Sequence, residues 1–229
     1  MRKMKITVVA LAALLTVSSC GTSQGTGTGI GAGAGAVLGG LIGGLANNSH
    51  HGTGAVVGAA IGADVGGLAG NRIGAHMDKK KAEIAQQVSN AKVEEVTDAN
   101  GLKAIKVTFD SGLQFDLGKS TLKSAAKNDL AKFASTLKND PMLAVDIQGY
   151  TDATGGDAIN LPLSDKRAKA VSSYLVSQGV SSSQFKNVAG YASANPIVNA
   201  TVAPENRRVE VYLYASDKMV KSAENGTLE

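Results

Sequence analysis

Glycine recurs at every fourth position through the first third of this 229-residue chain. One run extends from Gly27 to Gly43, and a second extends from Gly54 to Gly74. On an α-helix, a spacing of four places these glycines along one slowly drifting stripe. Because glycine has no side chain, two such stripes let helix backbones approach closely, as small residues do between membrane helices. The spacing predicts a helical hairpin over residues 29–76, which we call the glycine zipper.

The glycine content of this segment indicates the environment in which it can fold. Nineteen of the 28 glycines lie between Gly21 and Gly74, and each costs a helix in water about 1 kcal/mol relative to alanine. The helices are therefore expected to need a partner, and one over residues 27–46 would reach about 30 Å, the thickness of a bilayer core. Asp64 argues against simple burial in lipid. A disordered glycine-rich linker and an unrelated glycine-rich loop structure are the alternatives.

The first 19 residues have the layout of a secretory signal peptide. A basic start precedes an apolar run from Ile6 to Val17, and two serines lead to Cys20, the only cysteine. This ending resembles the lipobox of bacterial lipoproteins, which implies acylation of Cys20. Gly21 follows it, which by the same resemblance favours the outer membrane over the inner. Several acyl chains anchor a protein more firmly than one. An ordinary signal peptide and a retained membrane helix are the alternatives.

The charge balance excludes one class of function. The formal net charge of +4 includes three basic residues of the signal segment, and without them 20 basic residues face 19 acidic ones. Residues 79–81 are the one dense basic run, which is typical of a solvated helix start or a membrane-adjacent segment. We therefore expect no binding of nucleic acid through bulk charge.

Beyond residue 100 the hydrophobic period changes to two, which is typical of strands. The pattern predicts strands at 105–109, 143–149, 185–190 and 207–214, with helices at 120–139 and 164–179. Ser120 and Ser164 are the expected N-caps of the two helices. Right-handed crossovers would lay both helices on one face of the sheet, which gives a two-layer α+β sandwich of order βαβαββ.

The expected organisation has six parts. They are a lipoprotein signal peptide (1–19), a flexible linker (20–28), the glycine zipper (29–76), a helical spacer (77–100) capped by Asp78, the folded domain (101–216) and a disordered tail (217–229).

Three motifs follow one another in the C-terminal half. They are G-Y-T-D at 149–152, N-x-x-L-S-x-x-R-A at 160–168 and N-R-R-V-E at 206–210. In this order they resemble the OmpA C-terminal family, whose members bind peptidoglycan non-covalently. The resemblance covers roughly residues 105–214 and implies the OmpA-like fold.

Asp152 and Arg167 are the candidate binding residues. Asp152 follows a predicted strand, and Arg167 is expected in the first turn of the next helix, so the two side chains would meet at one loop. A carboxylate and a guanidinium across a pocket suit a ligand that carries both an ammonium and a carboxylate. By the resemblance, the two residues hold the backbone groups of diaminopimelate in the peptide stem, with Thr151 and Asn160 beside them. A plain surface ion pair is the alternative.

Arg207 and Arg208 are also candidates for the site. One of them is expected to line the groove and the other to brace the sheet edge, and the sequence leaves open which does which. A purely structural role for both is the alternative. The chain departs from the family at Tyr150, where histidine is common, and at Ala192, where glycine is usual. The loop at 198–205 is also shorter than in the family.

The leading hypothesis is a lipid-anchored protein of the outer membrane with its C-terminal domain in the periplasm. Its expected partners are peptidoglycan and, through acylated Cys20 and the glycine zipper, outer-membrane lipid; homo-oligomers stay open. Neither a cofactor nor a metal is expected, because His50 and His51 fit a turn better than a metal site. An enzyme is not expected, since all three histidines precede the predicted domain. The alternative is an oligomeric glycine-zipper pore or assembly factor.

Overall fold

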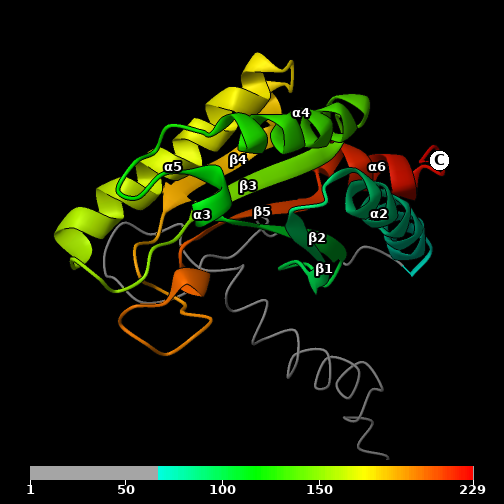
Figure 1. Ribbon diagram of the computed structural model, residues 1–229. Helices are drawn as coiled ribbons and strands as arrows, with labels where there is room; N and C mark the ends of the chain where they lie inside the picture. The colour runs from blue at the N-terminus through cyan, green and yellow to red at the C-terminus, as the bar shows by residue number, and fades with distance from the viewer. Residues whose placement is uncertain (1–66, 229) are drawn as a thin grey trace, which may run out of the picture.

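A five-stranded sheet with helices on one face forms the C-terminal domain (Figure 1). The structure is a computed structural model and describes residues 67–228. Cys20 and residues 29–66 of the glycine zipper lie outside this range. The strands are β1 (Ala91–Thr97), β2 (Lys103–Asp110), β3 (Leu143–Gly149), β4 (Phe185–Gly190) and β5 (Arg208–Ala215). The helices are α2 (Gly67–Gln87), α3 (Ser111–Gln114), α4 (Ser124–Asn139), α5 (Asp157–Ser177) and α6 (Asp217–Glu224), with 3-10 turns η1 (Ser182–Gln184) and η2 (Pro204–Asn206).

The order of the strands across the sheet is β1-β2-β5-β3-β4. Neighbouring strands are antiparallel except β3 and β4, which are parallel and joined by α5. Such a crossover brings the carboxyl ends of both strands to one edge of the sheet, where α5 begins. The predicted two-layer α+β fold is confirmed, and the predicted strand–helix order holds from β2 to β5.

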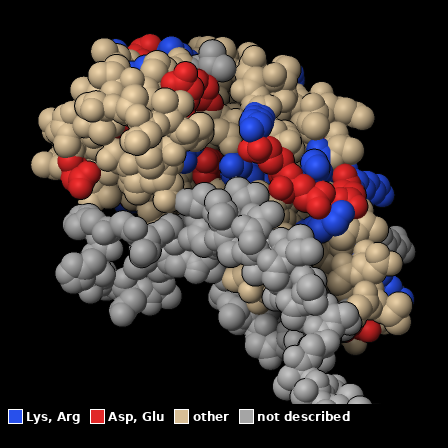
Figure 2. Space-filling model, turned by 90° about the horizontal axis from the view of Figure 1, so that it is seen from below, with Lys and Arg blue, Asp and Glu red and all other residues tan. Residues whose placement is uncertain are grey.

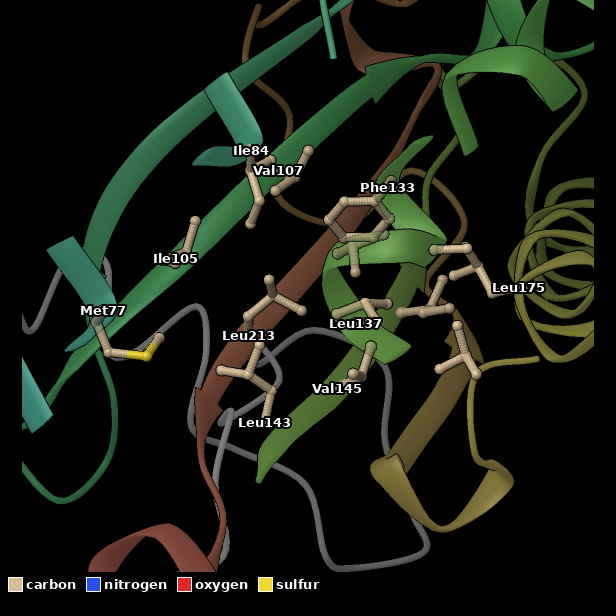
Figure 3. Packing of buried hydrophobic residues seen from close by; sticks show 14 of the residues in the cluster. Met77, Ile84, Ile105, Val107, Phe133, Leu137, Leu143, Val145, Leu175 and Leu213 are labelled. Atoms are coloured by element: carbon tan, nitrogen blue, oxygen red, sulfur yellow. The ribbon is translucent and has the colours of Figure 1, made fainter. Parts of the chain in front are cut away.

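One hydrophobic core lies between the sheet and the helices (Figure 3). Alternate residues of each strand point into it, so β3 contributes Val145 and β5 contributes Leu213. Phe133 of α4 packs edge-on against Phe109 of β2, with ring centroids 5.9 Å apart. Met77 brings α2 into the same core. The core therefore fixes α2, α4 and α5 on the same face of the sheet.

The other face of the sheet carries buried polar side chains. The Tyr214 hydroxyl donates a hydrogen bond to Asp146 at 3.0 Å, and the Tyr212 hydroxyl donates to Glu210. Burial raises the pKa of Asp146 to about 6, and the hydrogen bond from Tyr214 only partly offsets this rise.

The prediction of a helical spacer over residues 77–100 was wrong. The helix starts earlier and ends at Gln87, and β1 then pairs with β2. A turn after β1 makes this hairpin, since the Asp98 carboxylate accepts hydrogen bonds from the backbone N–H groups of Asn100 and Leu102. Asp78 is not a cap, because it lies within α2 and pairs with Lys103 at 2.8 Å.

Charged side chains of both signs are interleaved in a band on the underside of the molecule (Figure 2). On the hairpin, Lys106 pairs with Glu94 at 3.3 Å, and Lys103 lies 3.5 Å from Glu95. Because β1 is an edge strand, these charges disfavour its pairing with another chain.

The prediction of a disordered tail over residues 217–229 was wrong for residues 217–224, which form α6. Ser216 caps α6 by accepting a hydrogen bond from the Met219 backbone N–H. Met219 is fully buried, and Arg72 of α2 donates to the Ala223 carbonyl at 2.8 Å. The tail was mistaken for linker because its apolar residues are sparse, yet they fall on one helix face.

The predicted helix starts were also wrong. α4 begins at Ser124 rather than after Ser120, and α5 begins at Asp157, seven residues before Ser164. Gly155 and Gly156 have φ values of +90° and +70°, which lets the chain turn directly into α5. His76 lies in α2 and contacts the Asp140 carboxylate, so one histidine does belong to the folded domain.

Candidate functional site

The candidate site lies where α5 crosses the ends of β3 and β4. Figure 1 shows α3, the start of α5 and the connection between β4 and β5 at this end of the sheet. Two glycines allow the close crossing. A Cβ atom on Gly149 would lie 2.2 Å from the Ser164 carbonyl oxygen, and one on Gly190 would lie 2.2 Å from the Asp165 nitrogen. The helix backbone thus rests directly on the strand ends, and Arg167 follows one turn later.

Asp152 is buried in the loop between β3 and α5, with 5% of its surface exposed. Its Oδ1 accepts a hydrogen bond from the Thr154 backbone N–H at 3.2 Å. Its Oδ2 has no hydrogen-bond partner within the described part of the chain. The side-chain nitrogen of Asn160 holds this loop by donating to the carbonyls of Asp152 (3.1 Å) and Thr154 (2.9 Å). A buried carboxylate oxygen without a donor is unusual, and this one is free to accept a hydrogen bond from a group that enters the site.

Arg167 lies in the middle of α5 rather than in its first turn, and it is 4% exposed. Its Nε donates a hydrogen bond to the Lys119 carbonyl at 3.0 Å, and its guanidinium lies 5.2 Å from the centre of the Phe115 ring. Burial lowers its pKa, the nearby Arg207 lowers it further, and Asp152 opposes both. Arginine nevertheless stays charged in proteins.

The structure brings Asp152 and Arg167 to the same site without a direct contact. Among residues 67–228, no ion pair within 4 Å joins them. The alternative of a plain Asp152–Arg167 ion pair is therefore not what the structure has.

The two adjacent arginines have separate positions. Arg207 has a side chain that is 33% exposed, and its Nη1 lies 3.6 Å from Oδ2 of Asp152. Arg208 is buried, donates from Nε to Glu210 at 2.7 Å and from Nη2 to the Asn195 carbonyl at 3.0 Å, and stacks on Tyr150. Arg207 thus faces the site, and Arg208 braces the other face of the sheet.

The side chains of Thr151 and Tyr150, which directly follow β3, have different surroundings. The Thr151 hydroxyl is buried without a hydrogen-bond partner among the described residues, next to Asp152. Tyr150 instead donates to Gln148 at 2.7 Å on the far face of the sheet. The Tyr150 ring, at the position where the family commonly has histidine, therefore points away from the site.

The shortened loop at 198–205 is firmly held. Oδ1 of Asn206 accepts hydrogen bonds from the backbone N–H groups of Ile197 (2.7 Å) and Val198 (2.9 Å), and the Asn206 side chain donates back to the Val198 carbonyl. Ala192, where the family favours glycine, has a φ of +49°, in the left-handed region that glycine adopts most easily. The first residue of the N-R-R-V-E motif therefore fixes the loop beside the site.

A pocket of about 280 Å³ adjoins Arg167 and Arg207. Its lining includes Arg167, Arg207, Lys123, Asp110, Asp116 and Phe115, together with Ser111, whose buried hydroxyl has no hydrogen-bond partner among the described residues. None of the three sequence motifs contains the residues from 110 to 123. Their only signal was a polar stretch directly after a predicted strand, the position where binding residues commonly lie.

Two family models match the chain. Residues 114–210 match the model described as the OmpA family, and residues 1–78 match the YMGG-like Gly-zipper model. The match to the OmpA family thus holds for residues 114–210, which contain all three motifs. These motifs supply Asp152, Arg167 and Arg207 from three separate segments, and the OmpA-family fold brings them to one end of the sheet.

Several curated proteins are similar to this chain. Probable lipoprotein YiaD of Escherichia coli K12 is 35% identical over 147 residues, which is 63% of this chain and 65% of that protein. Peptidoglycan-binding protein ArfA of Mycobacterium tuberculosis is 42% identical over 113 residues, which is 47% of this chain and 34% of that protein. The matched part thus spans less than two thirds of these relatives.

A solved structure agrees on the fold. The putative MotB-like protein from Desulfovibrio vulgaris superimposes with a TM-score of 0.54 at 20% identity, over 64% of this chain and 96% of that one. Within residues 67–228, no helix combines the length and apolar character that crossing a bilayer requires.

Proposed function

We propose that this protein binds the peptide stems of peptidoglycan through its OmpA-family domain and tethers the outer membrane to the cell wall. One observation carries the proposal: the buried Oδ2 of Asp152, without a hydrogen-bond partner, lies at the same site as the cations Arg167 and Arg207. The likeness to a protein named for peptidoglycan binding supports it.

The chemistry of the site fits the zwitterionic end of diaminopimelate. The ligand ammonium would donate to Asp152, whose oxygen is already desolvated, and the ligand carboxylate would accept from Arg167. Hydrogen bonds between charged groups are about twice as strong as neutral ones. Arg167 is held in place by the Lys119 carbonyl and by Phe115, so little side-chain freedom is lost on binding.

We propose binding without catalysis. The candidate side chains are one carboxylate, two guanidiniums, an amide and a hydroxyl, and within residues 67–228 no base accepts a hydrogen bond from that hydroxyl, on Thr151. Affinity at one site would be modest, and many copies on one membrane would bind one wall with a much higher combined strength.

The proposed attachment to the membrane rests on the sequence of residues 1–78. Cys20 would carry the acyl chains, and the match of residues 1–78 to a glycine-zipper model supports a role of that segment at the membrane. Incorporation of labelled palmitate should be lost in Cys20→Ser, and the variant should leave the membrane fraction. Equal labelling of both proteins would contradict the anchor.

Co-sedimentation with isolated sacculi tests the binding. The purified protein should pellet with the wall, and Asp152→Asn and Arg167→Gln should each weaken binding by roughly tenfold or more, since each removes a charged hydrogen bond. Asp157→Asn is the matched control, because it makes the same change at an exposed position in the first turn of α5. The proposal fails if folded Asp152→Asn pellets as well as the control.

A further inference from the structure

Arg207 covers the carboxylate that the ligand is proposed to use. Its Nη1 lies 3.6 Å from Oδ2 of Asp152, which is close enough for strong attraction but too long for a hydrogen bond. The Asp152 side chain is 7% exposed, whereas that of Arg207 is 33% exposed. Arg207, a partly solvated cation, thus lies where the ligand ammonium is proposed to bind. It lacks the hydrogen bond to Asp152 that an ammonium would make.

The backbone of Arg207 is fixed while its side chain reaches across the site. The Arg207 N–H donates to the Pro204 carbonyl at 3.0 Å, and the Arg207 carbonyl accepts from the Ser111 N–H at 2.9 Å. Its side chain makes no hydrogen bond to the part of the chain that the structure describes, and it lines the pocket that Arg167 also lines. The guanidinium can therefore change partner without a movement of the chain.

Arg207 also stands near a like charge. The pKa of Arg167 is lowered first by burial and then by Arg207, because the two guanidiniums repel each other, and Asp152 is the anion that offsets this repulsion. If a ligand ammonium pairs with Asp152, Arg207 loses its counter-ion while it still lies near the Arg167 guanidinium. Such a state is unfavourable unless a new anion arrives at the same time.

We propose that Arg207 determines the specificity of the site by making it selective for zwitterions. In the free protein Arg207 is the counter-ion of Asp152; the ligand ammonium displaces it, and Arg207 then pairs with the carboxylate of the same ligand, alongside Arg167. An amine alone leaves Arg207 without an anion, and a carboxylate alone must compete with Asp152 for Arg207. This inference rests on the proposed function, and it adds that the two ligand charges bind cooperatively.

Calorimetric titration of the purified protein with three soluble stem fragments tests the inference. The probes are a stem tripeptide ending in diaminopimelate with its side-chain zwitterion free, the same peptide with that carboxylate amidated, and the same peptide with that amine acetylated. For the wild type, amidation should weaken binding by roughly tenfold or more, a usual size for such coupling. In Arg207→Gln, the zwitterion should bind more weakly and the amide more tightly than in the wild type, so that the penalty of amidation shrinks by roughly fivefold, to the part that the bond to Arg167 contributes.

Two further variants complete the design. Arg207→Lys restores the charge and should recover most of the preference for the zwitterion. Lys138→Ala removes one positive charge at the end of α4, where the Lys138 side chain contacts the turn that follows α5 at Gly179, and it should behave as the wild type. A uniform loss of affinity for all three probes in Arg207→Gln would overturn the inference, as would no change at all. Failure of the wild type to bind any probe would instead count against the proposed function.

Discussion

Alanine in place of Gly149 would put a methyl carbon 2.2 Å from the Ser164 carbonyl oxygen. Real Cβ atoms essentially never come closer than 3.0 Å to such a neighbour, so α5 must retreat from β3 by about 0.8 Å or more. The obstacle is the backbone of a helix packed on a sheet, which cannot rotate away as a side chain would. Overpacking of this kind costs about 1–3 kcal/mol, and we expect Gly149→Ala to lie at the upper end, near 3 kcal/mol.

The same retreat should impair the site. Arg167 is on α5 and Asp152 follows β3, so the two would separate by a similar amount, beyond the narrow range of charged hydrogen bonds. We expect sacculus binding to fall by roughly tenfold, the loss of one such bond, in protein that is still folded.

Urea denaturation followed by circular dichroism measures the stability, and co-sedimentation measures the binding. Gly67→Ala is the matched control, because a Cβ there meets nothing within 4 Å, and it should lose no stability. Unchanged urea midpoints for both variants would refute the argument that α5 rests on Gly149.

Three further predictions concern buried groups. Burial raises the pKa of Asp146 to about 6, so the folded carboxyl holds its proton more tightly than the unfolded one, and the free energy of unfolding should fall as pH rises from 4 through 6. Asp146→Asn should abolish this slope and be more stable than the wild type at pH 8 by up to roughly 3 kcal/mol. Equal slopes for the two proteins in urea denaturation would contradict the shift. Arg208→Ala leaves Glu210 buried without its 2.7 Å partner and should cost about 3–5 kcal/mol; a loss below about 1 kcal/mol in thermal denaturation would argue against the brace. Met219→Ala should cost about 2–5 kcal/mol because α6 is packed in the core, and an unchanged urea midpoint would mean that α6 is dispensable.

The sequence predicted β2, β3, β4 and β5 because each carries apolar residues at near-alternate positions. β3 and β4 begin and end where the pattern placed them, and β5 is displaced by one residue. β1 was missed because Glu94 and Glu95 interrupt the alternation, and its pairing with β2 decides its structure more than its own pattern does. The start of α5 was missed because two glycines, not a capping side chain, make the turn into it.

Of the site, only the residues that belong to one of the three motifs could be predicted from the sequence. Asp152, Thr151, Asn160 and Arg167 lie together as expected, although their binding role stays a prediction. Arg207 and Arg208 take opposite faces because neighbouring residues of a strand alternate. The motif alone did not say which of the two faces the site. The pocket residues from 110 to 123 come from a segment about thirty to forty residues upstream of Asp152, and the pairing of β2 with β5 brings them next to Arg207.

The most direct test of stem binding at Asp152 and Arg167 is an NMR titration of the isotope-labelled protein with the zwitterionic stem tripeptide. The largest shifts should fall on the backbone amides of residues 151–154, on Arg167 and its Nε–H, and on the Ser111 N–H that donates to the Arg207 carbonyl. Asp152→Asn should abolish these shifts. Shifts that cluster on the β1–β2 hairpin, or a spectrum unchanged at saturating peptide, would contradict binding at this site.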